Sequence, residues 1–243
     1  MDFSNKIFVS AGCSFSTCEP RGPVTWPAQT QEILKPKEHI SKGMGSQGNG
    51  LIARSIIYEV NRLLKQGVKN TDIVVGVMWS GYSRHEYYWD KHARGGEWEP
   101  THHDGWLVNP TNFNNEDTDG GWVITNAHWK TCEEYYKYYY DHIGGQINTL
   151  EHVLRTQWFL EKHNISYFMM QYMDETFNLS NRIPCRHLYE QIDWTKFPTN
   201  RGCFEWCKEN NEHYIDETLH PTSKGHRAFT ESIIIPYIKS NIL

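Results

Sequence analysis

Two short segments near opposite ends of the chain carry residue types that could together perform nucleophilic catalysis. The segment GCSFS (residues 12–16) follows a short hydrophobic run, and DETLHP (residues 216–221) lies near the other end. A serine hydroxyl is inert at neutral pH unless a base within hydrogen-bond reach takes its proton, and histidine is the commonest base. These residue types suggest Ser14 as a nucleophile and His220 as its base.

A histidine base needs a partner that fixes its tautomer and stabilises the imidazolium as it forms. Asp216 and Glu217 lie four and three residues before His220, and either carboxylate could take this role. Taken alone, an acid shortly before a histidine often arises by chance and is more typical of a solvated helix start. Cys13 is an alternative nucleophile because thiolates attack readily, but its position one residue before the serine should point it elsewhere.

Regular elements are expected where hydrophobic residues recur with a fixed period. Buried or extended strands are predicted at residues 6–10, 39–40, 72–78, 166–172 and 214–215. Helices are predicted at residues 26–34, from the glycine-rich loop 43–50 to a stop at Gly67, at 132–163 with a break at Gly144-Gly145, at 204–210, and from 222 towards the end with a bend or interruption at Pro236. Strands separated by helices indicate a three-layer α/β/α domain with a central parallel sheet of about five strands.

The predicted topology brings the polar candidates to one edge of this sheet. Ser14, the loop from Gly45 to Asn49, the pair Trp79-Ser80 and the segment before His220 each follow a predicted strand. Ligands of open α/β sheets bind beyond the carboxyl ends of the strands. We therefore expect a site at that edge.

The length suits one domain spanning residues 1–243, with residues 80–131 as an irregular insertion or cap. In that insertion His102-His103-Asp104 fits a solvated loop better than a metal site, because adjacent histidines rarely point the same way. Cys203 and Cys207 lack a second matching pair, so we expect no metal site and no cofactor.

Composition narrows the function classes. The net charge of −5 and the lack of a basic run argue against nucleic-acid binding. No apolar run reaches the roughly 18 residues of a membrane span and no signal peptide is visible, so we expect no membrane association and a cytoplasmic location, or the host cytoplasm or virion for a viral protein. The six cysteines are expected to be mostly free thiols. Aromatic residues make up 14% of the chain, which fits either a carbohydrate-binding surface or a tryptophan-rich core.

The two end segments, in this order, resemble the SGNH hydrolases, also called the GDSL esterase/lipase superfamily. The first block of that family, Gly-Asp-Ser-x-Ser, is similar to residues 12–16, and its fifth block, Asp-x-x-His-Pro, is similar to residues 217–221 or to a variant that uses Asp216. The resemblance implies a flavodoxin-like fold, Ser14 as nucleophile and His220 as base. Spacing favours Glu217 as the acid, whereas the family's usual residue type favours Asp216.

The middle blocks match the family more loosely. By the resemblance, Gly45 contributes a backbone N–H to the oxyanion hole together with that of Ser14. The family's third-block asparagine is missing, because this chain reads Trp79-Ser80 there. Asn49 or the Ser80 hydroxyl is the candidate substitute. One such donor is worth about 100- to 1000-fold in rate.

A subset of SGNH-like proteins, many of them viral or bacterial, resembles this chain more closely. That subset has a Gly-Cys-Ser-Phe-Ser/Thr start and a Trp-Ser/Thr third block followed by an arginine, which Arg84 matches. Arg84 and Trp79 are therefore candidate substrate contacts.

The resemblance implies a serine esterase that works through an acyl-enzyme. The polar, aromatic insertion favours a small-molecule or glycan ester, such as an O-acetylated carbohydrate. The alternatives are a non-catalytic carbohydrate-binding module and a structural, viral protein on the same scaffold. The residues do not indicate an oligomeric state.

Overall fold

Four hydrophobic segments form a parallel β-sheet in the computed structural model, which describes residues 3–18, 22–90, 106–108, 120–125 and 133–243. The strands lie in the order β2-β1-β3-β7. Their bounds are β1 Ile7–Ala11, β2 Glu38–Ser41, β3 Ile73–Trp79 and β7 Ser166–Gln171. All three pairings are parallel, with Val9 opposite both Ile40 and Val75. The prediction of an α/β protein with a parallel sheet is confirmed, with four strands instead of about five.

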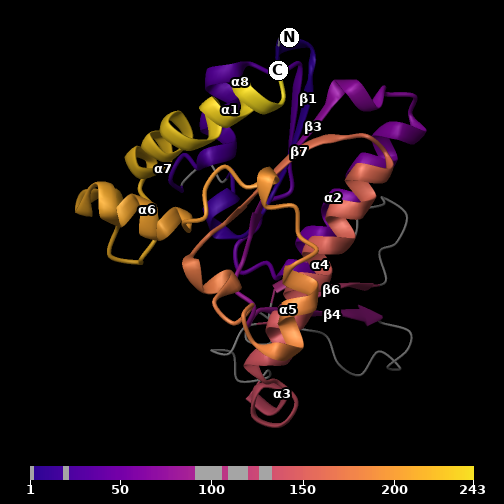
Figure 1. The fold of residues 1–243 in the computed structure, drawn as a ribbon, viewed down its shortest axis with the longest axis vertical. Coiled ribbons are helices and arrows are strands. Elements are labelled where there is room, and N and C mark those ends of the chain that lie inside the picture. The colour runs from indigo at the N-terminus through magenta and orange to yellow at the C-terminus, as the bar shows by residue number, and fades with distance from the viewer. Residues whose placement is uncertain (1–2, 19–21, 91–105, 109–119, 126–132) are drawn as a thin grey trace.

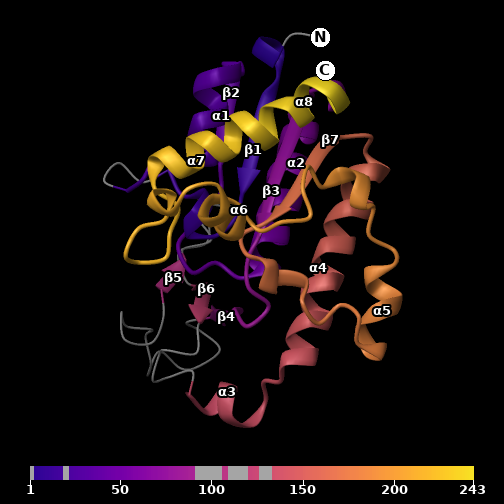
Figure 2. The same ribbon diagram turned by 60° about the vertical axis from the view of Figure 1, so that its left-hand side comes forward.

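Helices cover both faces of this sheet. Their bounds are α1 Trp26–Leu34, α2 Asn49–Lys65, α3 Glu133–Tyr138, α4 His142–Lys162, α5 Ile183–Tyr189, α6 Cys203–Asn210, α7 Ser223–Phe229 and α8 Ile235–Asn241. Figure 1 shows α1, α6, α7 and α8 on one side of the strands and α2, α4 and α5 on the other. Figure 2 shows the same layers after a rotation of 60°.

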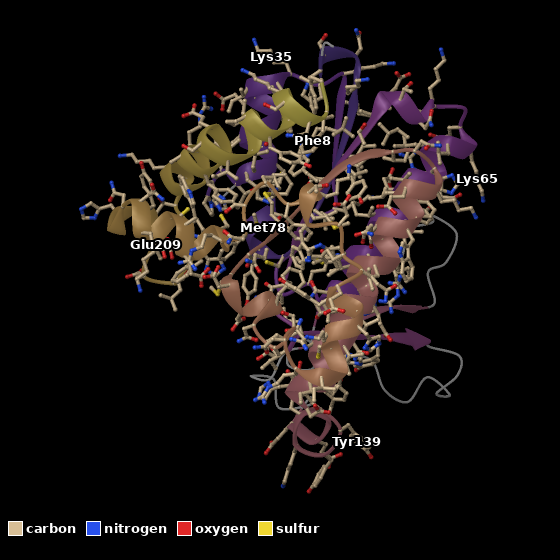
Figure 3. All side chains as sticks on the ribbon, viewed as in Figure 1. Phe8, Lys35, Lys65, Met78, Tyr139 and Glu209 are labelled. Atoms are coloured by element: carbon tan, nitrogen blue, oxygen red, sulfur yellow. The ribbon has the colours of Figure 1, made fainter. Side chains whose placement is uncertain are left out.

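Alternate residues of each strand feed two separate cores, as the period of a strand requires. In β1, Ile7 and Val9 pack with α2 and α4, whereas Phe8 packs with Trp26 and the C-terminal helices. In β3, Val75 and Met78 likewise enter opposite cores. In Figure 3, Phe8 and Met78 lie among the packed side chains near the strands. Burial of both faces explains why these strands read as unbroken apolar runs.

Two predicted features of the second half of the chain are wrong. Tyr214-Ile215 is not a sheet strand, because Ile215 forms only an isolated bridge to Pro221. The helix expected at 132–163 is interrupted before Gly144, since Asp141 caps α4 by accepting a hydrogen bond from the Gly144 N–H at 2.9 Å. Both glycines therefore lie inside α4.

The C-terminal helix passes through one wide turn. Between α7 and α8, residues Thr230–Ile234 form a π-helical segment, and Pro236 lies in the first turn of α8. Proline lacks an N–H and clashes with the preceding helical turn, and a π turn accommodates it without ending the helix. The expected disturbance at Pro236 is confirmed.

Part of the expected insertion at 80–131 is regular. A second, antiparallel sheet has the order β4-β6-β5, formed by His85–Asp90, Gly120–Thr125 and Trp106–Val108. Outside the described residues lie 91–105, 109–119 and 126–132, which include His102-His103-Asp104. The expectation that this insertion forms a cap therefore stays a prediction. Among the described helices, none combines the length and apolarity that crossing a bilayer requires.

Candidate functional site

Ser14 lies at the carboxyl end of the central strand β1, where the chain turns into a short 3₁₀ helix, Ser14–Ser16. Two glycines allow the close packing there. A Cβ at Gly12 would lie 2.9 Å from the Met78 carbonyl oxygen and collide with the Ser16 hydroxyl, and a Cβ at Gly43 would collide with the Ser16 backbone. The Ser14 side chain is half-buried, so its hydroxyl remains accessible at the edge of the sheet.

His220 lies opposite Ser14, although 206 residues separate them. The Ser14 Oγ and His220 Nε2 atoms are 2.9 Å apart, within hydrogen-bond distance. The other ring nitrogen, Nδ1, is 2.9 Å from the backbone carbonyl oxygen of Thr218 and 3.0 Å from the Thr218 hydroxyl, which donates its own proton to Asp216 Oδ1. A carbonyl can only accept, so Nδ1 carries the proton and Nε2 is left as the acceptor for the serine O–H. This is the tautomer that a base for Ser14 requires.

The Asp216 carboxylate shapes the turn that presents His220 and does not contact the imidazole ring. Its Oδ1 accepts hydrogen bonds from the Thr218 N–H at 2.8 Å, the Thr218 hydroxyl at 2.6 Å and the His220 backbone N–H at 3.0 Å. The same turn places Leu219 in the left-handed region at φ 62°. Burial alone would raise the pKa of Asp216, but the hydrogen bonds from Thr218 and His220 outweigh it and lower that pKa.

The other two candidates near the dyad lie elsewhere. Glu217 is exposed and forms no hydrogen bond or ion pair with any described residue, so the structure does not bring it to His220. Cys13 is fully buried in the core formed with Phe15 and Trp26, so its thiol points away from the accessible Ser14 hydroxyl.

Two backbone N–H groups remain candidates for an oxyanion hole. The loop after β2 lies against the end of the segment that leads to Ser14, because the Met44 N–H donates a hydrogen bond to the Gly12 carbonyl oxygen at 3.1 Å. Gly45 follows, with open space where a side chain would lie. Neither the Ser14 N–H nor the Gly45 N–H donates a hydrogen bond within the described ranges. Both donors are thus free to bind an oxygen atom.

The side chains of Asn49 and Ser80 both have hydrogen-bond partners within the protein. The Asn49 amide donates to the Ser80 carbonyl at 2.9 Å and to the Thr149 hydroxyl at 3.0 Å, and its Oδ1 accepts from the Ser80 N–H at 2.7 Å. Ser80 is fully buried, and its hydroxyl accepts from Arg84 Nη1 at 2.7 Å. These contacts join the start of α2 to the end of β3.

The expected contact residues Trp79 and Arg84 differ in accessibility. Trp79 is fully buried in the core beneath α2 and α4, which argues against contact with a ligand. Arg84 is half-buried, and its guanidinium lies 5.3 Å from the centre of the Tyr172 ring. The Tyr172 ring packs edge-on against the Phe15 ring, with 5.4 Å between the ring centres. The centres of the Phe15 and His220 rings are 5.2 Å apart. Arg84 is therefore two aromatic rings away from the imidazole.

Three contributors to the site carry no clear sequence signal. Thr218 holds the Nδ1 side of the His220 ring through both its carbonyl and its hydroxyl, contacts that depend on how the turn folds back. Phe15 and Tyr172 form the wall beside the imidazole. The position of Tyr172 directly after β7 could have pointed to it, because the carboxyl ends of all four strands share one edge.

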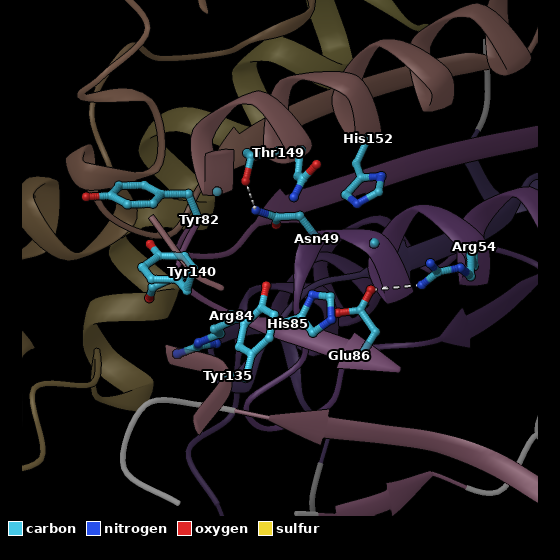
Figure 4. A pocket seen from close by; sticks show the side chains of 14 residues that line it. Asn49, Arg54, Tyr82, Arg84, His85, Glu86, Tyr135, Tyr140, Thr149 and His152 are labelled. Carbon is cyan, nitrogen blue, oxygen red and sulfur yellow. Dashed lines mark hydrogen bonds and ion pairs between the residues drawn. The ribbon is translucent and has the colours of Figure 1, made fainter. Parts of the chain in front are cut away.

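A cavity of about 230 Å³ opens at the same end of the molecule, between α2, α4 and β4. Figure 4 shows Tyr82 and Tyr140 on one side of it and His152 and Arg54 on the other. Arg84 also lines it, so this residue lies next to both the cavity and the aromatic wall of the dyad. In the part of the chain that the structure describes, no three His, Cys, Asp or Glu side chains converge as metal ligands. The five described cysteines form no disulfide bonds.

The fold and the site define an α/β protein with a serine–histidine pair at the carboxyl edge of its parallel sheet. The chain belongs to a family of unknown function, DUF6071, whose model matches residues 14–243 and so includes both members of the pair. No curated protein matches the chain.

Proposed function

We propose that this protein is a serine hydrolase of the SGNH type that cleaves a carboxylic ester, with an O-acyl group on a carbohydrate as substrate. The observation that carries the proposal is the 2.9 Å contact between Ser14 Oγ and an unprotonated His220 Nε2. The strand order 2-1-3 followed by the next strand is that of flavodoxin-like folds, and the pair lies at the edge where such folds bind ligands.

The proposed reaction proceeds through an acyl-enzyme. His220 Nε2 takes the proton of Ser14 as its oxygen attacks the ester carbonyl, and the N–H groups of Ser14 and Gly45 stabilise the oxyanion. The tetrahedral intermediate collapses as His220 returns the proton to the departing alcohol. A water molecule, deprotonated by the same imidazole, then releases the carboxylic acid and restores Ser14.

The Thr218 carbonyl takes the place that a carboxylate has in a triad. A neutral carbonyl holds the imidazole in the correct tautomer but stabilises the imidazolium less than an ionised acid does. Asp216 does not contact the ring and acts through the Thr218 hydroxyl, which lies 3.0 Å from Nδ1, and through the backbone N–H of His220. We therefore expect a slower hydrolase than one with a directly bonded carboxylate.

The experiment is hydrolysis of p-nitrophenyl acetate by the wild type and by Ser14→Ala and His220→Ala. Exposed thiols also cleave this ester, so Cys18→Ser is the matched control, since Cys18 is an exposed cysteine four residues after Ser14 in the sequence. We expect background rates in the first two variants and the wild-type rate in Cys18→Ser. Equal rates in wild type and Ser14→Ala would rule out Ser14 as the nucleophile.

A second candidate function is a non-catalytic carbohydrate-binding module on the same scaffold. It is favoured by the engagement of Asn49 with Ser80 and Thr149, which leaves no side-chain donor from that residue for an oxyanion. Sugar binding without any Ser14-dependent hydrolysis would support this function over the first.

A further inference from the structure

The cavity between α2, α4 and β4 combines buried charge with groups that have no internal partner. Glu86 on β4 is 7% exposed, and its carboxylate accepts a hydrogen bond from Arg54 Nη1 of α2 at 2.8 Å. This pairing compensates the charges of Glu86 and Arg54. Figure 4 shows both side chains at one end of the cavity.

The two histidines of the cavity are uncharged at neutral pH. Burial lowers the pKa of His152 to about 3, with the charge of Arg155 adding to the effect, and burial followed by the charge of Arg54 lowers the pKa of His85. A neutral imidazole offers one donor and one acceptor nitrogen. The His152 ring forms no hydrogen bond with any described residue, so both of its nitrogens are available to a ligand.

Hydroxyl and aromatic groups complete the lining. The Tyr135 ring stacks on His85 at 4.6 Å, Tyr140 and Tyr82 face the cavity from the other side, and Asn148 lies at its exposed rim on α4. Such walls present donors, acceptors and flat apolar faces, together with the guanidinium of Arg84, whose described contacts are the neutral Ser80 hydroxyl and the Tyr172 ring. An apolar ligand would leave these polar groups unpaired.

We propose that this cavity binds one hydroxyl-rich sugar residue, held by His152 and Asn148 and lying against the tyrosine rings. The volume of about 230 Å³ corresponds to roughly eight water molecules at ~30 Å³ each, which is the size of a monosaccharide. Binding does not depend on the chemistry of Ser14. The further step, that this sugar carries the ester cleaved by Ser14, rests on the proposed function and on Arg84, which borders both places.

The test is titration calorimetry with the full chain carrying Ser14→Ala, which removes any hydrolysis. The probes are methyl β-D-glucopyranoside, methyl β-D-galactopyranoside, N-acetyl-D-glucosamine and D-glucuronate. We expect at least one of these four sugars to bind with a dissociation constant below about 10 mM. Failure of all four sugars to bind would overturn the inference.

Variants locate the binding. His152→Ala and Asn148→Ala should each weaken binding about 3- to 10-fold, the effect of losing a hydrogen bond of ordinary strength. Glu151→Ala, an exposed neighbour on α4 outside the cavity lining, should leave it unchanged. Asn148 is exposed, so its variant should fold even where His152→Ala does not. Unchanged binding in Asn148→Ala and in a folded His152→Ala would place the sugar elsewhere and refute the assignment.

The outcomes for the two proposals are separable. Sugar binding with no Ser14-dependent hydrolysis in the wild type refutes the hydrolase and leaves the sugar site standing. Hydrolysis of p-nitrophenyl acetate without sugar binding does the reverse, because that ester is too small to need the cavity.

Discussion

Replacement of Asp216 by alanine, compared with replacement of Glu217, separates a positioning carboxylate from a directly bonded one. Asp216→Ala removes one acceptor of three hydrogen bonds, at 2.6, 2.8 and 3.0 Å, all within the turn that carries His220. Partly exposed hydrogen bonds contribute about 0.5–1 kcal/mol each, so the turn loses about 1.5–3 kcal/mol. The left-handed backbone conformation of Leu219 then loses the hydrogen bonds that stabilise it.

If that free energy is needed to keep His220 in place, its loss appears in the rate. At about 1.4 kcal/mol per tenfold change, Asp216→Ala should lower kcat/KM for p-nitrophenyl acetate roughly 10- to 150-fold. Asp216→Asn retains an acceptor oxygen and should recover most of that loss. Glu217→Ala is the matched control and should change the rate less than twofold, because that side chain is exposed and unpaired within the described residues.

The assay is steady-state kinetics from pH 5 to 9, with circular dichroism to confirm folding. A carboxylate bonded directly to the imidazole would instead give a loss near 10⁴-fold in both Asp216 variants. That result, or a larger effect of Glu217→Ala than of Asp216→Ala, would refute the positioning role.

Three further predictions concern packing, charge and contact with substrate. Gly12→Ala should lower the free energy of unfolding by about 1–3 kcal/mol in urea, because its Cβ would collide with Ser16 and crowd the Met78 carbonyl. Burial lowers the pKa of His226 to about 3, so between pH 6.5 and 3 this imidazole binds a proton in the unfolded chain but not in the folded chain. The free energy of unfolding should therefore fall as the pH drops from 6.5 towards 3. His226→Leu should reduce that slope by about 1.4 kcal/mol per pH unit, and an unchanged slope in acid titrations of stability would contradict the buried neutral state. Arg84→Ala should raise KM for an acylated sugar more than for p-nitrophenyl acetate, measured side by side; equal effects would remove Arg84 from sugar recognition.

The sequence was sufficient for elements whose pattern is set by burial. The apolar runs that became β1, β3 and β7 and the helical spacing of α2 and α4 reflect faces packed against the sheet, and these elements lie close to their predicted bounds. Gly67 ends α2 as expected, with φ 82° just beyond the helix. The parallel order of these elements also brought Ser14 and His220 to one edge.

Features decided by a single contact could not be predicted. The interruption before α4 depends on one capping bond from Gly144 to Asp141, whereas the glycine pair was the visible signal. Tyr214-Ile215 has strand-like residues but only one bridge partner, Pro221.

The same holds for the polar residues of the site. Spacing could not choose between Asp216 and Glu217, because the choice depends on the left-handed turn at Leu219. The amide of Asn49 is taken by the backbone of Ser80, a pairing across 31 residues that no local pattern reveals. Burial of Trp79 follows from its place as the last residue of a central strand, where both faces are covered.

The most direct test of the central claim is covalent labelling of the protein by a fluorophosphonate, followed by peptide mass spectrometry. The serine–histidine pair predicts one adduct per chain on Ser14, lost in Ser14→Ala and slowed at least about 100-fold in His220→Ala. An adduct that persists in Ser14→Ala, or labelling of Ser14 at the same rate without His220, would contradict the account.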